Sequence, residues 1–564
     1  MAESTGGRAR ADTDATTPAM SRARTVSSWL LVLLLIGGSA AGACSGGSTV
    51  SSVTGGSAST AEPTDEGLPR PTLRLLIVTD MKGYLEPCGC QRRPLGGIDK
   101  LATELARARA GGVPTLFLHA GDLLFDGLDH SVRGADASAQ EIWKAETLVE
   151  VLSQLGLAAA TAGPLEARQG VDTLRRLAGT ARFPLLAAGA TFGGEPLHAE
   201  PVVREVGGLK VGIFGVSELE APNGTVPEGL ARTAELRAAA QAEATRLRAA
   251  GAQLVIGLSR ASRRSARSIA TGTTGLDFLV EGGLAEGTPI LPARAGDVVT
   301  LNAARQGHGL LVVDVFRRGT GAFTDISAWT RTSERARLAV SAVELRARIA
   351  EWERSGHAAT DIATQKTRLA AMEREREALM QRPDVRGNAF AARFIELDPQ
   401  VAGDPAIGAV IDRYDARVND HNRVAFAGLL PREPAPGQPH YVGSDACQTC
   451  HRAEHTWWRS TQHGRAYATL TRQHKEFNLS CVGCHVTGYN QPGGSTVTHN
   501  EGLVDVGCEN CHGAGSAHAA DSGVPIARVD VPETVCVQCH NDEHSDHFDY
   551  RAYRAMLIAP GHGQ

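Results

Sequence analysis

Cys447-Gln-Thr-Cys450-His451 is the first copy of a pattern that repeats through the last quarter of the chain. Each copy has two cysteines separated by two residues, and a histidine directly follows the second cysteine. The other copies are Cys481-Val-Gly-Cys484-His485, Cys508-Glu-Asn-Cys511-His512 and Cys536-Val-Gln-Cys539-His540. This pattern is the attachment signature of c-type haem. The two thiols form thioethers with the porphyrin, and the adjacent imidazole becomes the proximal ligand of the iron.

Two other kinds of cysteine site use similar spacings. Paired CxxC motifs form zinc ribbons, and exported proteins join cysteines in disulfides. Neither site requires a histidine after every second cysteine, whereas all four copies have one. The sequence therefore favours four covalently bound haems c. Their predicted proximal ligands are His451, His485, His512 and His540.

Histidines are concentrated in the same part of the chain, with 13 of the 19 in the last 125 residues. The iron of an electron-transfer haem needs a sixth ligand, which histidine commonly supplies. The first candidates for this distal position are His463 and His518, followed by His547 and His499. Spacing alone does not assign them to individual haems, and the other histidines fit equally well as surface residues or partners of haem propionates.

Two of the motifs lie in longer stretches that resemble a known family. Tyr441-Val-Gly-Ser-Asp-Ala-Cys447, with Thr461-Gln-His-Gly-Arg-Ala466 after it, looks like the opening of cytochrome c-554-type multihaem proteins. Gly507-Cys-Glu-Asn-Cys-His-Gly-Ala-Gly-Ser-Ala-His518 looks like their third haem site. The resemblance covers about residues 440–550. It implies a small, mostly helical domain organised by closely stacked haems, and it leaves open whether one iron lacks a sixth ligand.

The first half of the chain alternates apolar, strand-like runs with helix-like segments. Leu73–Thr79 and Thr115–His119 predict buried strands, and residues 97–110 predict a helix between them. The alternation continues through Leu254–Gly257 and Leu276–Val280, which is typical of an α/β domain. We place this domain at residues 71–332.

Short motifs at the predicted strand ends resemble the calcineurin-like metallophosphatases, specifically the 5′-nucleotidase branch. They include Thr79-Asp-Met-Lys-Gly-Tyr-Leu-Glu-Pro87 and Ala120-Gly-Asp122. The resemblance implies an αββα sandwich in which Asp, Asn and His ligands hold two metal ions that activate water. Asp80 and Asp122 match two of these ligands.

The remaining ligand positions of that family carry other residues. The histidine expected two residues after Asp80 is Lys82, and the Gly-Asn-His-Glu motif corresponds to Gly163-Pro-Leu-Glu166. The later Ser-His aligns with Ser259-Arg260, and the closing Gly-His-x-His falls on Gly282–Ala285. Two carboxylates cannot replace a ligand set rich in imidazole. We therefore expect a vestigial site, with the Lys82 ammonium in place of a metal and no hydrolase activity.

Cys88-Gly-Cys90 follows the first predicted strand, beside the vestigial site. Glycine between the two cysteines permits a tight turn that brings the thiols together. The pair fits a small structural disulfide. It also fits a redox-active or metal-binding dithiol, because a strained disulfide is more easily reduced.

The N-terminus has the features of an export signal. Arg22 and Arg24 precede the apolar run Trp29–Ile36, and Ala41-Gly-Ala-Cys44 resembles a bacterial lipobox. We expect residues 1–43 to be a signal peptide, Cys44 to be lipidated, and residues 44–70 to form a flexible tether. The alternative is an ordinary signal peptide cleaved near Ala43.

Two connecting segments separate the halves. A three-and-four-residue apolar period over residues 333–385 predicts an antiparallel helical hairpin, which fits a spacer or a dimerisation arm. We interpret residues 386–439 as a helical connector that ends in a Pro-rich linker, and residues 440–564 as the tetrahaem domain.

Composition agrees with a soluble, exported protein. The 564 residues carry a net charge of −5, which gives no basic surface for nucleic acid. We expect an electron carrier of the cell envelope, periplasmic or at the cell surface and attached to the membrane by lipid, with redox proteins as partners. In this interpretation the α/β domain is a binding or docking module. Alternatives are a haem-dependent reductase of a small nitrogen or sulfur species, or a residual metal-dependent nucleotidase.

Overall fold

The structure is a computed structural model, and the residues it describes all lie within one compact unit, Asp65–Gln564. They are 70–87, 94–127, 135–198, 200, 202–221, 223–284, 288, 290, 292–327, 332–356, 358–380, 387–541, 544–545 and 548–559. The predictions for the signal peptide, Cys44, Cys88, Cys90 and His547 lie outside these residues.

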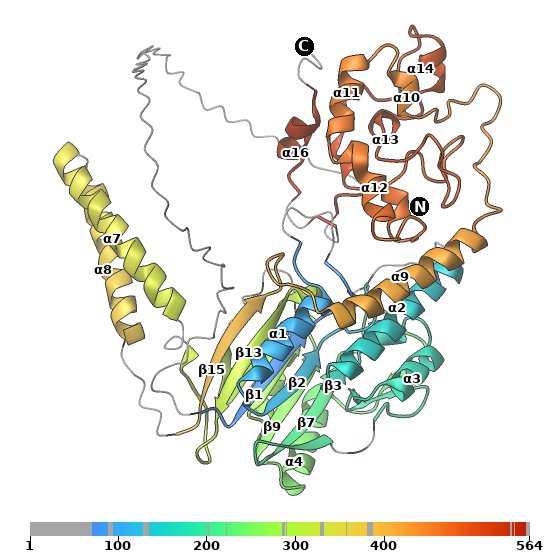
Figure 1. The fold of residues 1–564 in the computed structure, drawn as a ribbon. Coiled ribbons are helices and arrows are strands. Elements are labelled where there is room, and N and C mark those ends of the chain that lie inside the picture. The colour runs from blue at the N-terminus through green and yellow to red at the C-terminus, as the bar shows by residue number, and fades with distance from the viewer. Residues whose placement is uncertain are drawn as a thin grey trace, which may run out of the picture. The chain divides into compact units, whose positions relative to one another are not determined.

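The first sheet has seven strands in the order β14-β15-β13-β1-β2-β3-β4 (Figure 1). Strands β1 to β4 are parallel, whereas β13 runs antiparallel to both β1 and β15. The bounds are β1 Leu73–Thr79, β2 Thr115–Ala120, β3 Leu157–Thr161, β4 Leu185–Leu186, β13 Gly309–Phe316, β14 Thr324–Asp325 and β15 Ala389–Glu396. Because β1 is covered on both faces, its sequence is apolar throughout most of its length, and its Arg74 forms a buried ion pair with Asp314 at 2.6 Å.

The second sheet has the order β11-β12-β10-β9-β7-β6, and β5 and β8 form a separate pair. Its central strands β7, β9, β10 and β12 are parallel. The bounds are β5 Ala190–Phe192, β6 Val202–Val206, β7 Leu209–Ser217, β8 Leu230–Arg232, β9 Leu254–Arg260, β10 Phe278–Gly282, β11 Ala293–Ala295 and β12 Val298–Leu301.

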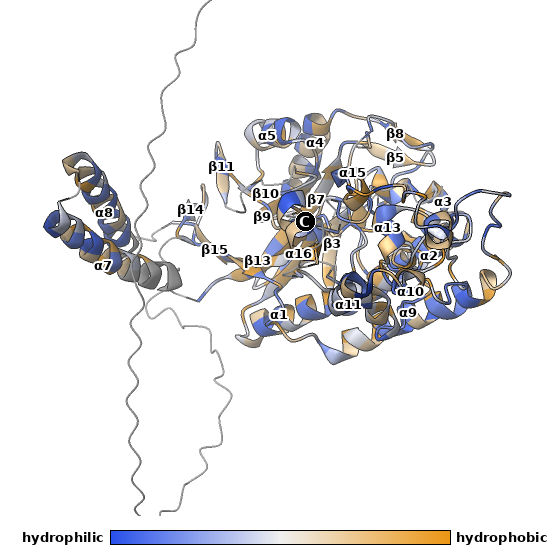
Figure 2. Cartoon of the chain, turned by 90° about the horizontal axis from the view of Figure 1, so that it is seen from above, coloured by the Kyte–Doolittle hydropathy of each residue, from blue (hydrophilic) through white to orange (hydrophobic). Residues whose placement is uncertain are grey.

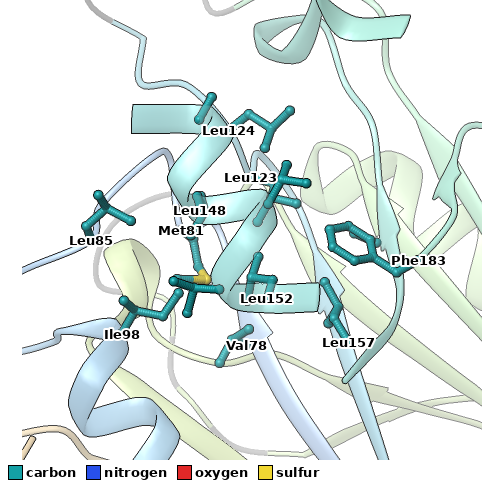
Figure 3. Close-up of a cluster of buried hydrophobic side chains, with 14 of the residues drawn as sticks. Val78, Met81, Leu85, Ile98, Leu123, Leu124, Leu148, Leu152, Leu157 and Phe183 are labelled. Carbon is teal, nitrogen blue, oxygen red and sulfur yellow. The ribbon is translucent and has the colours of Figure 1, made fainter. Parts of the chain in front are cut away.

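The two sheets pack face to face and are covered by helices, as the predicted αββα sandwich requires. Residues of both sheets, such as Ile77, Ile256 and Phe278, share the core between them. Helices α1, α2, α3 and α9 cover the first sheet, and Figure 3 shows part of this core around Met81 and Leu148. Helices α4 and α5 cover the second sheet. The bounds are α1 Ile98–Ala110, α2 Ala135–Gln154, α3 Val171–Thr180, α4 Leu236–Ala249, α5 Arg263–Gly272 and α9 Pro405–Ala425.

Helices α7 (Thr332–Ser355) and α8 (Ala359–Met380) pack against each other and confirm the predicted hairpin. Leu338, Leu345 and Ile349 on α7 are buried. Figure 2 shows hydrophilic residues along much of both helices. The ion pairs Arg346–Glu373 and Lys366–Glu353 link the two helices on their exposed sides.

The connector predicted for residues 386–439 needs a correction. Its first segment is strand β15, which pairs with β13 from Gly309↔Glu396 to Phe316↔Ala389. Helix α9 then packs on α1 and α2. The hairpin is therefore an insertion within the α/β domain, whose sheet is completed only after it. Local periodicity does not reveal such a return, because the partner strand lies about 80 residues earlier in the chain.

The C-terminal segment consists of short helices, as expected for the haem-binding part. They are α10 Ser444–Cys447, α11 Arg452–Ser460, η4 His463–Arg465, α12 Ala466–Thr471, η5 Val482–Cys484, α13 Cys508–His512, α14 Ser516–Ala520, α15 Glu533–Cys536 and α16 Tyr550–Leu557. Its apolar cluster is small and consists mainly of Leu479, Val482, Val486 and Val497. Within the described ranges, no helix is long and apolar enough to cross a membrane.

Candidate functional site

The strand ends of the α/β domain bring the remnants of the predicted metallophosphatase site together. Asp80 follows β1, Asp122 follows β2, Glu166 follows β3, and Arg260 is the last residue of β9. Because the carboxyl ends of parallel strands meet at one edge of a sheet, side chains far apart in the sequence become neighbours there.

Asp80 is held rigidly in this cluster. Its carboxylate accepts hydrogen bonds from the backbone N–H of Asp122 at 3.1 Å and of Gly283 at 2.9 Å. Gly121 has a φ of 92°, and a Cβ at this position would lie 2.1 Å from the Asp80 carboxylate, so only glycine fits. Burial raises the pKa of Asp80 to about 6, and the negative charge of Asp122 adds to the rise.

Arg260 adds a second positive charge to the cluster, beside Lys82, whose charge acts on Asp80. The Arg260 Nε donates to the Asp122 carboxylate at 3.0 Å, and both side chains are at most 10% exposed. Its Nη1 also donates to the Glu220 carbonyl at 3.1 Å. Lys82 contributes its backbone N–H to the Asp122 carbonyl at 3.1 Å. The direct ion pair with Asp122 therefore comes from β9, at the position where the sequence aligned Ser259-Arg260 with Ser-His.

Glu166 is a member of this cluster that was not among the predicted site residues. Its carboxylate accepts from the backbone N–H groups of Leu123 at 2.6 Å, Leu124 at 3.2 Å and Gly163 at 2.7 Å. Burial, followed by the charge of Asp122, raises the pKa of Glu166 to about 7. The signal that could have found it is its place at the end of Gly163-Pro-Leu-Glu166, where the family motif also ends in Glu.

The raised pKa values predict that stability falls as the pH rises. A carboxyl whose folded pKa lies above its unfolded value binds more protons in the folded state, so its contribution is present below about pH 4 and is lost through pH 6–7. Between pH 4 and pH 7, we expect the unfolding free energy of wild type to fall by about 2 kcal/mol more than that of Asp80→Asn. Urea unfolding at both pH values measures this difference. The exposed Glu205→Gln is the control, and an equal pH dependence in Asp80→Asn and wild type would contradict the assignment.

In the described part of the chain, no group of three or more His, Cys, Asp or Glu side chains is arranged to hold a metal ion.

The four predicted haem-attachment motifs lie close to one another in the C-terminal segment. Cys447 of the first motif and Cys508 of the third are neighbours, and helix α10 of the first motif packs against α13 of the third. Cys484 of the second motif and Cys539 of the fourth are also neighbours. Helix α13 of the third motif packs against α15 of the fourth. The four motifs are therefore clustered, and the second also lies beside the third, because the Asn510 side chain donates to the Val486 carbonyl at 3.1 Å.

Two of the motif histidines each lie close to a different predicted distal histidine. The ring centres of His451 and His518 are 6.3 Å apart, and those of His463 and His540 are 6.1 Å apart. Two imidazoles that ligate one metal ion through nitrogen at about 2 Å have ring centres about 6 Å apart. The side chains therefore fit bis-histidine ligation of one iron at the first motif and one at the fourth.

Hydrogen bonds to backbone carbonyls orient the imidazoles of two motif histidines and one predicted distal histidine. Nδ1 of His485 lies 2.7 Å from the Ala466 carbonyl, and Nδ1 of His512 lies 2.7 Å from the Arg528 carbonyl. Nδ1 of His518 makes the same contact with the Val524 carbonyl at 2.7 Å. Since a carbonyl only accepts, Nδ1 must carry the proton. This leaves the lone pair of Nε2 available to a metal ion.

The other predicted distal candidates have different surroundings. His499 Nδ1 lies 3.1 Å from the Thr498 hydroxyl. Among the described residues, the ring of His499 is not paired with the ring of a motif histidine. Buried His455 directs Nε2 to Asp445 at 3.2 Å. His547 lies outside the described residues.

Glu509, inside the third motif, organises the backbone around it. Its almost fully buried carboxylate accepts from the N–H groups of Val442 at 3.1 Å, Gly443 at 2.8 Å and Gly515 at 2.7 Å. These bonds connect residues 442–443, at the start of the C-terminal segment, to the loop after the third motif. Glu509 was not among the predicted site residues, although it is the only acidic residue within the four motifs.

Comparison with known proteins finds similar proteins for both halves of the chain. Residues 446–513 match the family model described as cytochrome c554 and c-prime. Cytochrome c-554 of Nitrosomonas europaea is 33% identical over 97 residues, which cover 14% of this chain and 41% of that protein. The match implies c-type haem in this segment, and it spans about two fifths of the length of the relative.

Solved structures are similar to the α/β part. A 5′-nucleotidase precursor from Thermus thermophilus aligns with a TM-score of 0.43 and 18% identity, covering 66% of this chain and 62% of its own. A calcineurin-like phosphoesterase from Bacillus subtilis aligns with a TM-score of 0.38 and 20% identity, covering 45% and 87%. A segment that matches the cytochrome c554 and c-prime family is joined, in one chain, to the α/β domain.

Proposed function

We propose that this protein is an exported, lipid-anchored tetrahaem c-type cytochrome that relays electrons at the cell envelope. The observation that carries the proposal is the pairing of His451 with His518 and of His540 with His463, at separations that suit one iron between each pair. Cysteine pairs precede both motif histidines in the sequence. A c-type haem bound at such a site supplies a one-electron centre.

The closeness of the four motifs supports a relay rather than four isolated centres. The first motif lies beside the third, the third lies beside the second and the fourth, and the second also lies beside the fourth. The chain's own residues hold these sites in fixed positions: Glu509 joins the loops around the third motif, and Asn510 links the Gly507 N–H to the Val486 carbonyl. Rigid, adjacent centres are what electron transfer requires of the protein.

The α/β domain contributes a binding or docking function and no hydrolysis in this proposal. The Asp122–Arg260 pair supports it, because a guanidinium bonded to the bridging-type carboxylate already neutralises the charge that a metal ion would otherwise meet. Export and lipid attachment rest on the signal sequence and the lipobox-like Ala41-Gly-Ala-Cys44.

We expect His518→Ala to open the sixth coordination position of one haem. The change removes the imidazole opposite His451, and the Nδ1 bond to Val524 that orients it. About one quarter of the haem should become high-spin in the ferric protein and bind added cyanide, measured by absorption and electron paramagnetic resonance. The exposed His474→Asn is the matched control. Unchanged spectra in His518→Ala would contradict the pairing.

A further inference from the structure

The second haem-attachment motif, unlike the first, is packed against the α/β domain. Lys475, six residues before Cys481, is buried between the two parts of the chain. Its ammonium forms an ion pair with Asp415 of α9 at 3.4 Å and another with Glu86, which follows β1. These ion pairs connect the segment before the second motif to α9 and to the loop after β1.

A network of buried amides continues the contact. Gln140 of α2 donates to the Asn478 side chain at 2.8 Å, and its carbonyl oxygen accepts from the Leu479 N–H at 3.1 Å. Asn422 of α9 donates to the same Gln140 oxygen at 3.1 Å and to the Phe477 carbonyl at 2.9 Å. These bonds join α2 and α9 to residues 477–479, although, among the described residues, Oδ1 of Asn422 and Oδ1 of Asp415 are buried there without a hydrogen-bond partner.

Apolar contacts extend this surface to the motif itself. Ala137 of α2 belongs to the same buried cluster as Leu479, Val482, Val486 and Val497. Val482 lies between the two cysteines of the second motif and is fully buried. Water is therefore excluded from the side of this motif that faces α2.

The first motif has the opposite surroundings. Cys450 and His451 are exposed, whereas Cys481, Cys484 and His485 are only partly accessible. The first site is thus open to solvent, whereas the second is covered by the chain's own α/β domain.

We propose that the α/β domain is a fixed cover of the second haem site, and that outside redox partners exchange electrons at the first site. This inference rests on the proposed electron relay and adds which haem site exchanges electrons with outside partners. It also assigns a role to the fusion. The α/β domain is a permanent neighbour of the second haem site rather than a module that moves freely on its linker.

Cleaving the linker tests the fixed cover without relying on activity. A protease site placed at the exposed residues 435–437 of the full-length holoprotein would separate the two parts covalently. We expect the fragments to stay together in size-exclusion chromatography. The double variant Asn422→Leu/Lys475→Met should weaken their association by about a hundredfold. Arg413→Gln, which removes an exposed ion pair elsewhere on α9, should leave it unchanged.

Paired charge reversals test where electrons leave. In the reaction of reduced holoprotein with ferricyanide, each Fe(II) haem gives one electron to one ferricyanide, which becomes ferrocyanide. Arg452→Glu lies beside exposed His451, and Arg472→Glu is an equally exposed reversal close to the second motif in sequence. At low ionic strength we expect Arg452→Glu to slow the reaction about fivefold or more and Arg472→Glu to change it less than about twofold.

Three outcomes would overturn the inference: fragments that separate after cleavage, an Arg472→Glu effect as large as that of Arg452→Glu, or no effect of either reversal. The proposed relay would fail differently. A holoprotein that carries fewer than four covalent haems would contradict the relay, whereas separated fragments that keep four haems would contradict only the cover.

Discussion

The double variant Cys508→Ser/Cys511→Ser is expected to carry three covalent haems instead of four. The serine hydroxyl does not form the thioether that holds the porphyrin, so the third site is lost. We also expect the C-terminal segment to become sensitive to proteolysis, because its own apolar cluster is small and a buried haem supplies much of the remaining core. Electrospray mass of the denatured protein counts the haems, and limited proteolysis reports the loss of structure.

The position of the third motif makes this variant informative. It lies between the first motif, through the Cys447–Cys508 contact, and the fourth, through α13 and α15. Its loss should therefore remove the site beside the other three as well as lower the count. Cys88→Ser changes a cysteine outside the four motifs and should leave all four haems in place. A double variant with the same haem mass as wild type would show that these cysteines bind no haem.

Asp122→Ala is expected to destabilise the α/β domain by about 3–5 kcal/mol. The substitution leaves the Arg260 guanidinium buried without the carboxylate that it contacts at 3.0 Å. Urea unfolding followed by circular dichroism measures the loss. The exposed, helical pair Arg246–Glu243 provides the control, because Arg246→Ala should cost at most about 0.5 kcal/mol.

A double-mutant cycle separates the pair from its surroundings. Asp122→Leu/Arg260→Met removes both charges together and should recover much of the stability that Asp122→Ala loses. A loss below about 1 kcal/mol in Asp122→Ala would mean that the ion pair does not hold the strand ends together, and that another cation neutralises the cluster.

The parts of the structure that could be predicted from sequence are those with a local signal. The CxxCH copies carry their chemistry in five residues, and the apolar run Leu73–Thr79 predicts a buried strand by itself. The three-and-four period of Leu338, Ala342 and Leu345 predicts α7 in the same way. Each signal depends on residues within one or two turns of each other.

The remaining features depend on contacts between distant residues. Arg260 meets Asp122 across 138 positions. The alignment of Ser259-Arg260 with Ser-His marked the position, but no local signal shows that its guanidinium pairs with Asp122. Strand β15 returns to β13 after an inserted hairpin, so the α/β domain does not end at residue 332 as predicted. Gln140 meets Asn478 across 338 positions, which made the docking of the second motif invisible in the sequence.

The mass of the denatured, mature protein tests the central claim most directly. Thioether bonds survive denaturation, so the polypeptide should retain four haem groups and keep the absorption of c-type haem after unfolding. A polypeptide whose haem is extracted on unfolding, or whose mass leaves no room for covalent haem, would contradict the account.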